Sequence, residues 1–103
     1  MFDETTIETL KAKYGTIYLL AAAGFEVVVR PPTRQVWRKF RSLAADPAKR
    51  ADCVEGLFRD CVVYPELKDV DAMLNQKPAL AETFGDECAT LGGAKEDCEK
   101  NAL

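Results

Sequence analysis

Two short apolar segments separated by a glycine constrain the fold of this chain more than any other feature. Residues 16–22 and 25–30 are rich in β-branched and aromatic residues, and Gly24 lies between them. This pattern predicts a β-hairpin with Gly24 in its turn. Pro31 and Pro32 should end the second strand, because proline cannot donate a ladder hydrogen bond. Two strands are only marginally stable alone, so the hairpin must pack on helices or pair with another sheet edge.

Helical patterns occupy the rest of the chain. A capping pattern at Thr5 to Glu8 predicts a first helix that ends at Gly15, and Thr33 should cap a second one over 33–45. Further helices are expected from Asp46-Pro47 to about residue 64, over 70–76, and from 78 to 91 before Gly92. We therefore expect a mostly helical α+β fold: an N-terminal helix, one β-hairpin and about four short helices. Residues 1–93 should form a single domain, followed by a flexible tail over 94–103.

The residue inventory argues against catalysis. The 103 residues include no histidine and only one serine, Ser42. Histidine is the commonest general base and metal ligand, so Ser-His-Asp, Cys-His and HExxH chemistry are all impossible within this chain. No glycine-rich phosphate loop and no calcium loop occurs either. We expect no enzyme activity, no catalytic residue, no cofactor and no metal site.

The net charge of −3 hides a strong asymmetry along the chain. Residues 30–50 carry a net charge of +6, whereas residues 51–103 carry −7. Such a dipolar surface can steer an oppositely charged partner or promote self-association. The longest apolar run, over residues 17–23, is far shorter than the roughly 20 residues that span a bilayer. No targeting segment is visible, so we expect a soluble cytoplasmic protein with no membrane contact.

Four cysteines, at positions 53, 61, 88 and 98, lack the closely spaced pairs of structural zinc sites. Cys53 and Cys61 fall within one expected helix, where eight residues separate them by roughly 12 Å, too far for a disulfide. A Cys88–Cys98 bridge is sterically possible but has no support in the sequence. We expect free thiols, some of them buried as small hydrophobic residues.

The helix over 33–45 provides the first candidate binding surface. Arg34, Arg38 and Arg41 line up opposite its apolar face, and Trp37 flanks that face. The arginines could form an ordinary solvated surface, dock an acidic protein or, least favoured, bind nucleic acid. Trp37 suits either core packing, the favoured interpretation, or an interface anchor.

The hairpin provides the second candidate surface because its first strand is apolar on both faces. Tyr18 and Leu20 lie on one face, and Ile17, Leu19 and Ala21 lie on the other. A strand of this kind often packs or pairs on both sides. An exposed edge would favour self-association or strand addition from another chain.

Three short blocks resemble a group of small tail assembly chaperones from long-tailed bacteriophages and prophages. The first is Val28-Val-Arg-Pro-Pro-Thr33 leading into Trp37-Arg-Lys-Phe40, and the second is Arg59-Asp-Cys-Val-Val-Tyr-Pro65. The third is the Met73-Leu74 helix followed by Lys77-Pro-Ala-Leu-Ala-Glu82. Together the blocks span about half of the chain, from Val27 to Glu82.

The resemblance implies a non-enzymatic assembly factor of the infected host's cytoplasm. Such proteins associate with the tape measure protein, keep its hydrophobic helices soluble and help recruit tail tube subunits. They are generally absent from the finished virion, and many also occur in a longer form made by ribosomal frameshifting. The resemblance assigns no role to any single residue.

Two other functions remain open from the sequence. One is a small regulatory nucleic-acid-binding protein that uses the basic helix over 33–45, although the overall acidic charge disfavours it. The other is a small enzyme with Cys53 or Cys98 as its nucleophile. A homo-oligomer is compatible with each of these functions.

Overall fold

A computed structural model describes residues 4–103 of the chain. The elements in chain order are α1 (Glu4–Tyr14), β1 (Tyr18–Ala22), β2 (Phe25–Val29), α2 (Arg34–Ala45), a short 3₁₀ helix (Arg50–Asp52), α3 (Cys53–Cys61), β3 (Val62–Tyr64), α4 (Leu67–Gln76) and α5 (Leu80–Leu91). This is the mostly helical α+β fold that the sequence predicts. No helix within the described residues is long and apolar enough to cross a membrane.

The predicted hairpin is confirmed and forms two thirds of a three-stranded antiparallel sheet. The strand order is β1-β2-β3, with Leu20 opposite Val27 in the hairpin. The turn residues Ala23 and Gly24 have φ angles of 53° and 83°. Positive φ at both central residues is typical of a type I′ turn, whose twist matches that of the strands. Val27 and Val29 on one face of β2 and Val28 on the other are all buried, so β2 is the covered centre of the sheet.

The third strand is a feature that the sequence analysis missed. We expected the helix before Pro65 to run to about Tyr64, but α3 ends at Cys61 and residues 62–64 form β3. Val62 and Tyr64 pair there with Val29 and Val28 of β2. Two β-branched valines disfavour helix, and a residue that precedes proline avoids the helical region.

One predicted helix start is confirmed, and three others differ from the structure. Thr33 caps α2 as expected, since its Oγ1 accepts a hydrogen bond from the Val36 amide at 3.2 Å. Asp46 and Pro47 do not start a helix: the Asp46 carboxylate accepts from the Ala48 amide at 3.0 Å and closes a turn. The chain then passes through the 3₁₀ helix before α3 begins at Cys53. Two further helices start earlier than expected, α1 at Glu4 rather than in the capping pattern, and α4 at Leu67 rather than at residue 70.

The core lies between α3, α4, α5 and the inner face of β2. The rings of Phe58 and Phe84 meet at its centre with centroids 5.5 Å apart. Helices α3 and α5 come so close at Gly85 that a Cβ there would lie 2.5 Å from Val54 Cγ1 and 2.8 Å from the Val54 carbonyl oxygen. Glycine lowers the helix propensity in the middle of α5, but the close packing of the two helices requires it at this position.

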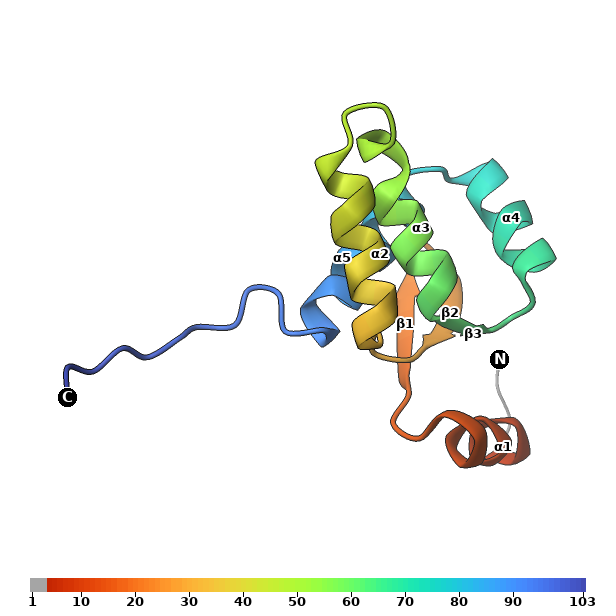
Figure 1. The fold of residues 1–103 in the computed structure, drawn as a ribbon. Coiled ribbons are helices and arrows are strands. Elements are labelled where there is room, and N and C mark those ends of the chain that lie inside the picture. Colours follow the sequence, from red (N-terminus) through yellow and green to blue (C-terminus); the bar gives the residue numbers. More distant parts are fainter. Residues whose placement is uncertain (1–3) are drawn as a thin grey trace.

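Neither α1 nor α2 contributes a fully buried side chain. Helix α2 lies side by side with α3, whereas α1 lies apart from the other helices, beyond the start of β1 (Figure 1). Gly92 ends α5 as predicted. Residues 96–103 form no helix or strand and extend away from the helices (Figure 1).

The packing at Gly85 predicts that Gly85→Ala destabilises the protein by about 1–3 kcal/mol, because overpacking forces backbone shifts. This loss outweighs the gain of up to about 1 kcal/mol in helix propensity. Gly56→Ala is the matched control, since its Cβ would meet only Leu43 Cδ1 at 4.0 Å and should leave stability equal or higher. Urea unfolding of the three proteins measures both changes, and an equally stable Gly85→Ala variant would contradict the proposed packing.

The hairpin turn predicts that Ala23→Asn stabilises the protein by about 0.5–1 kcal/mol. Alanine is sterically strained at positive φ, and asparagine followed by glycine is the favoured type I′ pair. Gly24→Ala should instead destabilise through its backbone alone, since a Cβ there meets nothing within 4 Å. Thermal unfolding should therefore rank Ala23→Asn first, wild type second and Gly24→Ala last.

Candidate functional site

The outer face of α2 carries the arginines that the sequence analysis selected. Arg34, Arg38 and Arg41 are all exposed and lie on one side of the helix, along roughly 10 Å of its axis. None of their guanidinium groups takes part in a hydrogen bond or ion pair within the described residues, whereas the neighbouring Lys39 Nζ lies 3.0 Å from Asp60 Oδ2. Residues 4–103 therefore leave three positive charges uncompensated on this face.

The inner face of α2 is apolar but incompletely covered. Trp37 is half-buried, and its ring centroid lies 5.0 Å from that of Phe40. Both rings, with Val36, pack against the core cluster without being fully enclosed. Trp37 thus packs at the edge of the core and remains partly exposed, while a role as an interface anchor stays a prediction.

Strand β1 is an edge strand with several exposed apolar side chains. Tyr18 is 42% exposed, whereas Leu20 on the same face is half-buried and packs against the core. The most exposed apolar side chain of this strand is Leu19, at 54%. Sequence reasoning placed Leu19 on the opposite face but did not select it as a binding residue. Only the structure shows that little covers that side.

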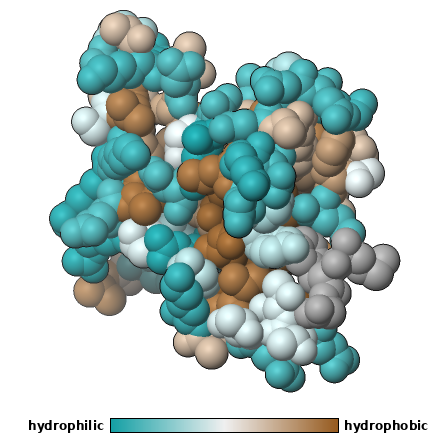
Figure 2. Space-filling model, turned by 90° about the vertical axis from the view of Figure 1, so that its right-hand side faces the viewer, coloured by the Kyte–Doolittle hydropathy of each residue, from teal (hydrophilic) through white to brown (hydrophobic). Residues whose placement is uncertain are grey.

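A band of apolar surface crosses the face at the right of Figure 1. Figure 2 shows this band running down the middle of that face, with hydrophilic side chains on both sides. A contiguous apolar area on a small protein is typical of a surface that binds another protein. The sequence analysis did not predict the band, because it forms only when separate elements come together.

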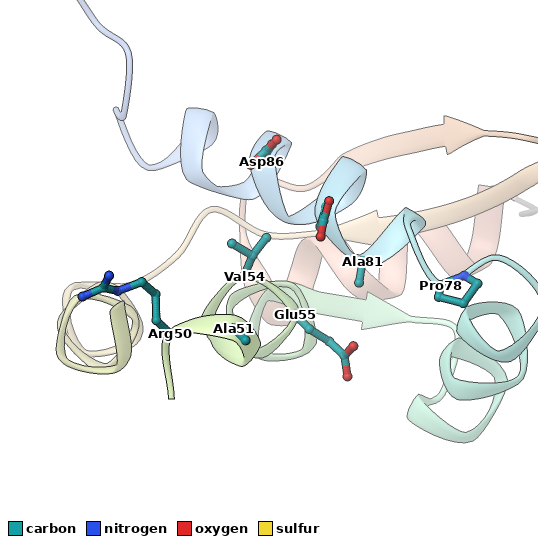
Figure 3. Close-up of a pocket in the computed structure, with 8 residues that line it drawn as sticks. Arg50, Ala51, Val54, Glu55, Pro78, Ala81 and Asp86 are labelled. Atoms are coloured by element: carbon teal, nitrogen blue, oxygen red, sulfur yellow. The ribbon is translucent and has the colours of Figure 1, made fainter. Parts of the chain in front are cut away.

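A pocket of about 420 Å³ lies where α3 meets α5. Its lining comes from two stretches of the chain, 50–55 and 78–86: Arg50, Ala51, Val54, Glu55, Pro78, Ala81, Glu82 and Asp86. The Arg50 Nε donates to the Ala44 carbonyl oxygen at 2.9 Å, and the charged groups of Arg50, Glu55 and Asp86 point in different directions (Figure 3). The pocket therefore brings no acid and base together. Within the described residues, no three metal-ligating side chains converge.

All four cysteines are free thiols. Cys53, Cys61 and Cys88 are buried, and Cys98 is exposed. A hydrogen bond from the Cys88 thiol to the Cys61 sulfur lowers the pKa of Cys61; the same bond, with burial, raises the pKa of Cys88. This pairing joins the end of α3 to α5, and local sequence patterns do not predict it. Cys53, one of the two nucleophiles considered from the sequence, is 5% exposed within the core.

The burial pattern predicts that one of the four thiols reacts rapidly with an aromatic disulfide reagent under native conditions. Cys98 is the exposed thiol, so Cys98→Ser should abolish the fast phase. All the remaining thiols should react once the protein is unfolded in guanidinium. A second fast thiol in the native protein would contradict the burial of Cys53, Cys61 and Cys88.

Comparisons with known proteins support the fold alone. No protein-family model matches this chain, and no curated protein matches it. A solved structure is similar: that of the uncharacterised protein RBSTP2171 from Bacillus stearothermophilus, with a TM-score of 0.77 and 18% sequence identity. The similarity covers 92% of this chain and 99% of the Bacillus chain. The fold is thus shared with another protein of nearly the same extent.

Proposed function

We propose that this protein is a phage tail assembly chaperone that binds the tape measure protein and assists tail tube assembly. The observation that carries the proposal is the outer face of α2, where Arg34, Arg38 and Arg41 are exposed and have no side-chain partner among residues 4–103. Charges that stabilise nothing within the chain are available to an acidic partner. The sequence blocks that resemble tail assembly chaperones include this helix, from Thr33 to Phe40.

The apolar surface supports a protein partner with hydrophobic segments. A chaperone of a long, apolar helix must cover that helix with apolar surface of its own, and the band in Figure 2 is such a surface. Charged side chains beside it would hold the partner in register, because rim charges set specificity and encounter rate more than affinity. No catalytic step is part of this proposal.

The proposal also places the protein in its assembly pathway. The protein would act in the host bacterial cytoplasm, keep the tape measure protein soluble and bring tail tube subunits to it. It would then be released, and the mature virion would not contain it. These statements follow from the resemblance.

A second candidate is a regulatory nucleic-acid-binding protein that uses α2. The observation in its favour is the same set of three uncompensated guanidinium groups on one helix face. Against it, the ring of Trp37 on the same helix is packed against Phe40 rather than free to stack on a base. An apolar band also binds the apolar surface of a protein better than it binds a charged phosphate backbone. We therefore favour the chaperone.

The proposal predicts that this protein co-purifies with a segment of the tape measure protein encoded in the same genome. Replacing Arg34, Arg38 and Arg41 with glutamine should weaken that complex by about tenfold or more, since three interfacial charges are lost. The control variant replaces three exposed lysines, Lys11, Lys95 and Lys100, with glutamine. It removes the same amount of positive charge from other parts of the surface. Calorimetric titration of the three proteins with the same segment gives the comparison.

Two outcomes would overturn the chaperone proposal. One is the absence of binding to every segment of the tape measure protein. The other is binding to DNA or RNA that weakens steeply with salt and is lost in the arginine variant but kept in the lysine variant, which would establish the second candidate. Circular dichroism of each variant confirms that the fold is retained.

A further inference from the structure

The two edges of the sheet differ in how they are protected. Strand β3 has three residues, and Pro65 and Glu66 follow it directly. Short strands, prolines and charges are the devices that keep a sheet edge from pairing with another chain. Strand β1 has five residues, without a proline or a charged side chain, and it pairs with β2 in unbroken register. The only irregularity of the sheet lies between Val28 and Val29, on the β3 side.

The free edge of β1 also coincides with incomplete burial. Leu19 is 54% exposed and Tyr18 42%, although both lie in the first strand of the sheet. Beside them, Leu20, Ala22 and Phe25 pack against the core but stay only partly buried. The helical layer therefore leaves the apolar core open along β1. A further strand at this edge would complete the cover.

From this edge we infer that two copies of the protein associate through their β1 strands, antiparallel and with Leu20 opposite Leu20. In this register Tyr18 lies opposite Ala22 of the second copy, and Leu19 lies opposite Ala21. Tyr18 and Leu19 then each face an alanine, the two Leu20 side chains meet each other on the two-fold axis, and the symmetry repeats the outer pairs. β1 is thus complementary to itself at all five positions, as an isologous interface requires.

Charge raises no obstacle to this pairing. Glu26 is the only charged residue in β1 and β2, and it lies opposite Ala21 within the hairpin. Three strand spacings would separate Glu26 from its symmetry mate, about 14 Å, which exceeds the Debye length of about 8 Å at physiological salt. The repulsion between the two carboxylates is therefore largely screened.

The geometry also limits the assembly to two copies. Pairing at β1 produces one six-stranded sheet whose outer edges are both β3, the short strand followed by proline. No second β1 edge remains available, so the assembly closes as a dimer rather than growing into a fibre. The inference rests on β1 alone. It is independent of the proposed function, which rests on the arginines of α2.

The inference predicts that the wild-type protein sediments as a dimer at submillimolar concentration. Leu19→Lys should raise the dissociation constant by about tenfold or more, because two lysines would lie diagonally on one face, about 7–8 Å apart. An exposed position tolerates lysine, so the variant should keep its helical circular dichroism. Leu67→Lys is the matched control, since Leu67 on α4 is 44% exposed and lies outside the sheet, and it should leave the dimer unchanged.

Disulfide trapping tests the register directly. In a Cys98→Ser background, the Leu19→Cys and Ala21→Cys proteins are mixed and oxidised, and a cross-linked heterodimer should exceed either homodimer. Leu67→Cys mixed with Ala21→Cys serves as the control and should form no excess heterodimer. A monomeric wild-type protein, a Leu19→Lys variant that remains fully dimeric, or no excess of the 19–21 cross-link would each overturn the inference.

Discussion

The close approach of α3 and α5 determines how the remaining elements are arranged. The absent side chain of Gly85 lets α5 rest on the backbone of Val54, which brings the rings of Phe58 and Phe84 together. From this pair, α3 continues directly into β3 and thereby ties the helices to the hairpin, while α2 packs along α3. A helix pair held at backbone distance thus sets the position of the sheet, and the sheet in turn leaves β1 at its open edge.

Local patterns predicted the elements of this fold but not the contacts between distant segments. Gly24 located the hairpin, and Thr33 located the start of α2, because turns and caps depend on neighbouring residues. The strand β3 was missed because the local preference of its two valines is weak, and the strand forms when Val62 pairs with Val29, which is distant in the sequence. The role of Gly85 could not be predicted for the same reason, because it depends on Val54, which lies on another helix.

The same distinction between local patterns and contacts of distant segments applies to the candidate surfaces. The arginine face of α2 could be predicted, because helical periodicity alone places Arg34, Arg38 and Arg41 together. The absence of ion-pair partners for these arginines among the described residues could not be predicted, because ion pairs such as that between Lys39 and Asp60 arise from tertiary packing. The pocket, the apolar band and the contact between two cysteines also required the folded chain. The greater exposure of Leu19 over its neighbour Leu20 depends on where the helical layer ends.

The arginine face of α2 is separate from the buried core, and this separation has a consequence for how such a protein can evolve. The side chains that hold the fold together, such as Phe58, Phe84 and Gly85, are separate from the side chains available to a partner. Selection for stability and selection for recognition therefore act on different residues. The outer face of α2 can change its chemistry while the core stays constant. The fold shared at 18% identity with a Bacillus protein shows that very different sequences can form it.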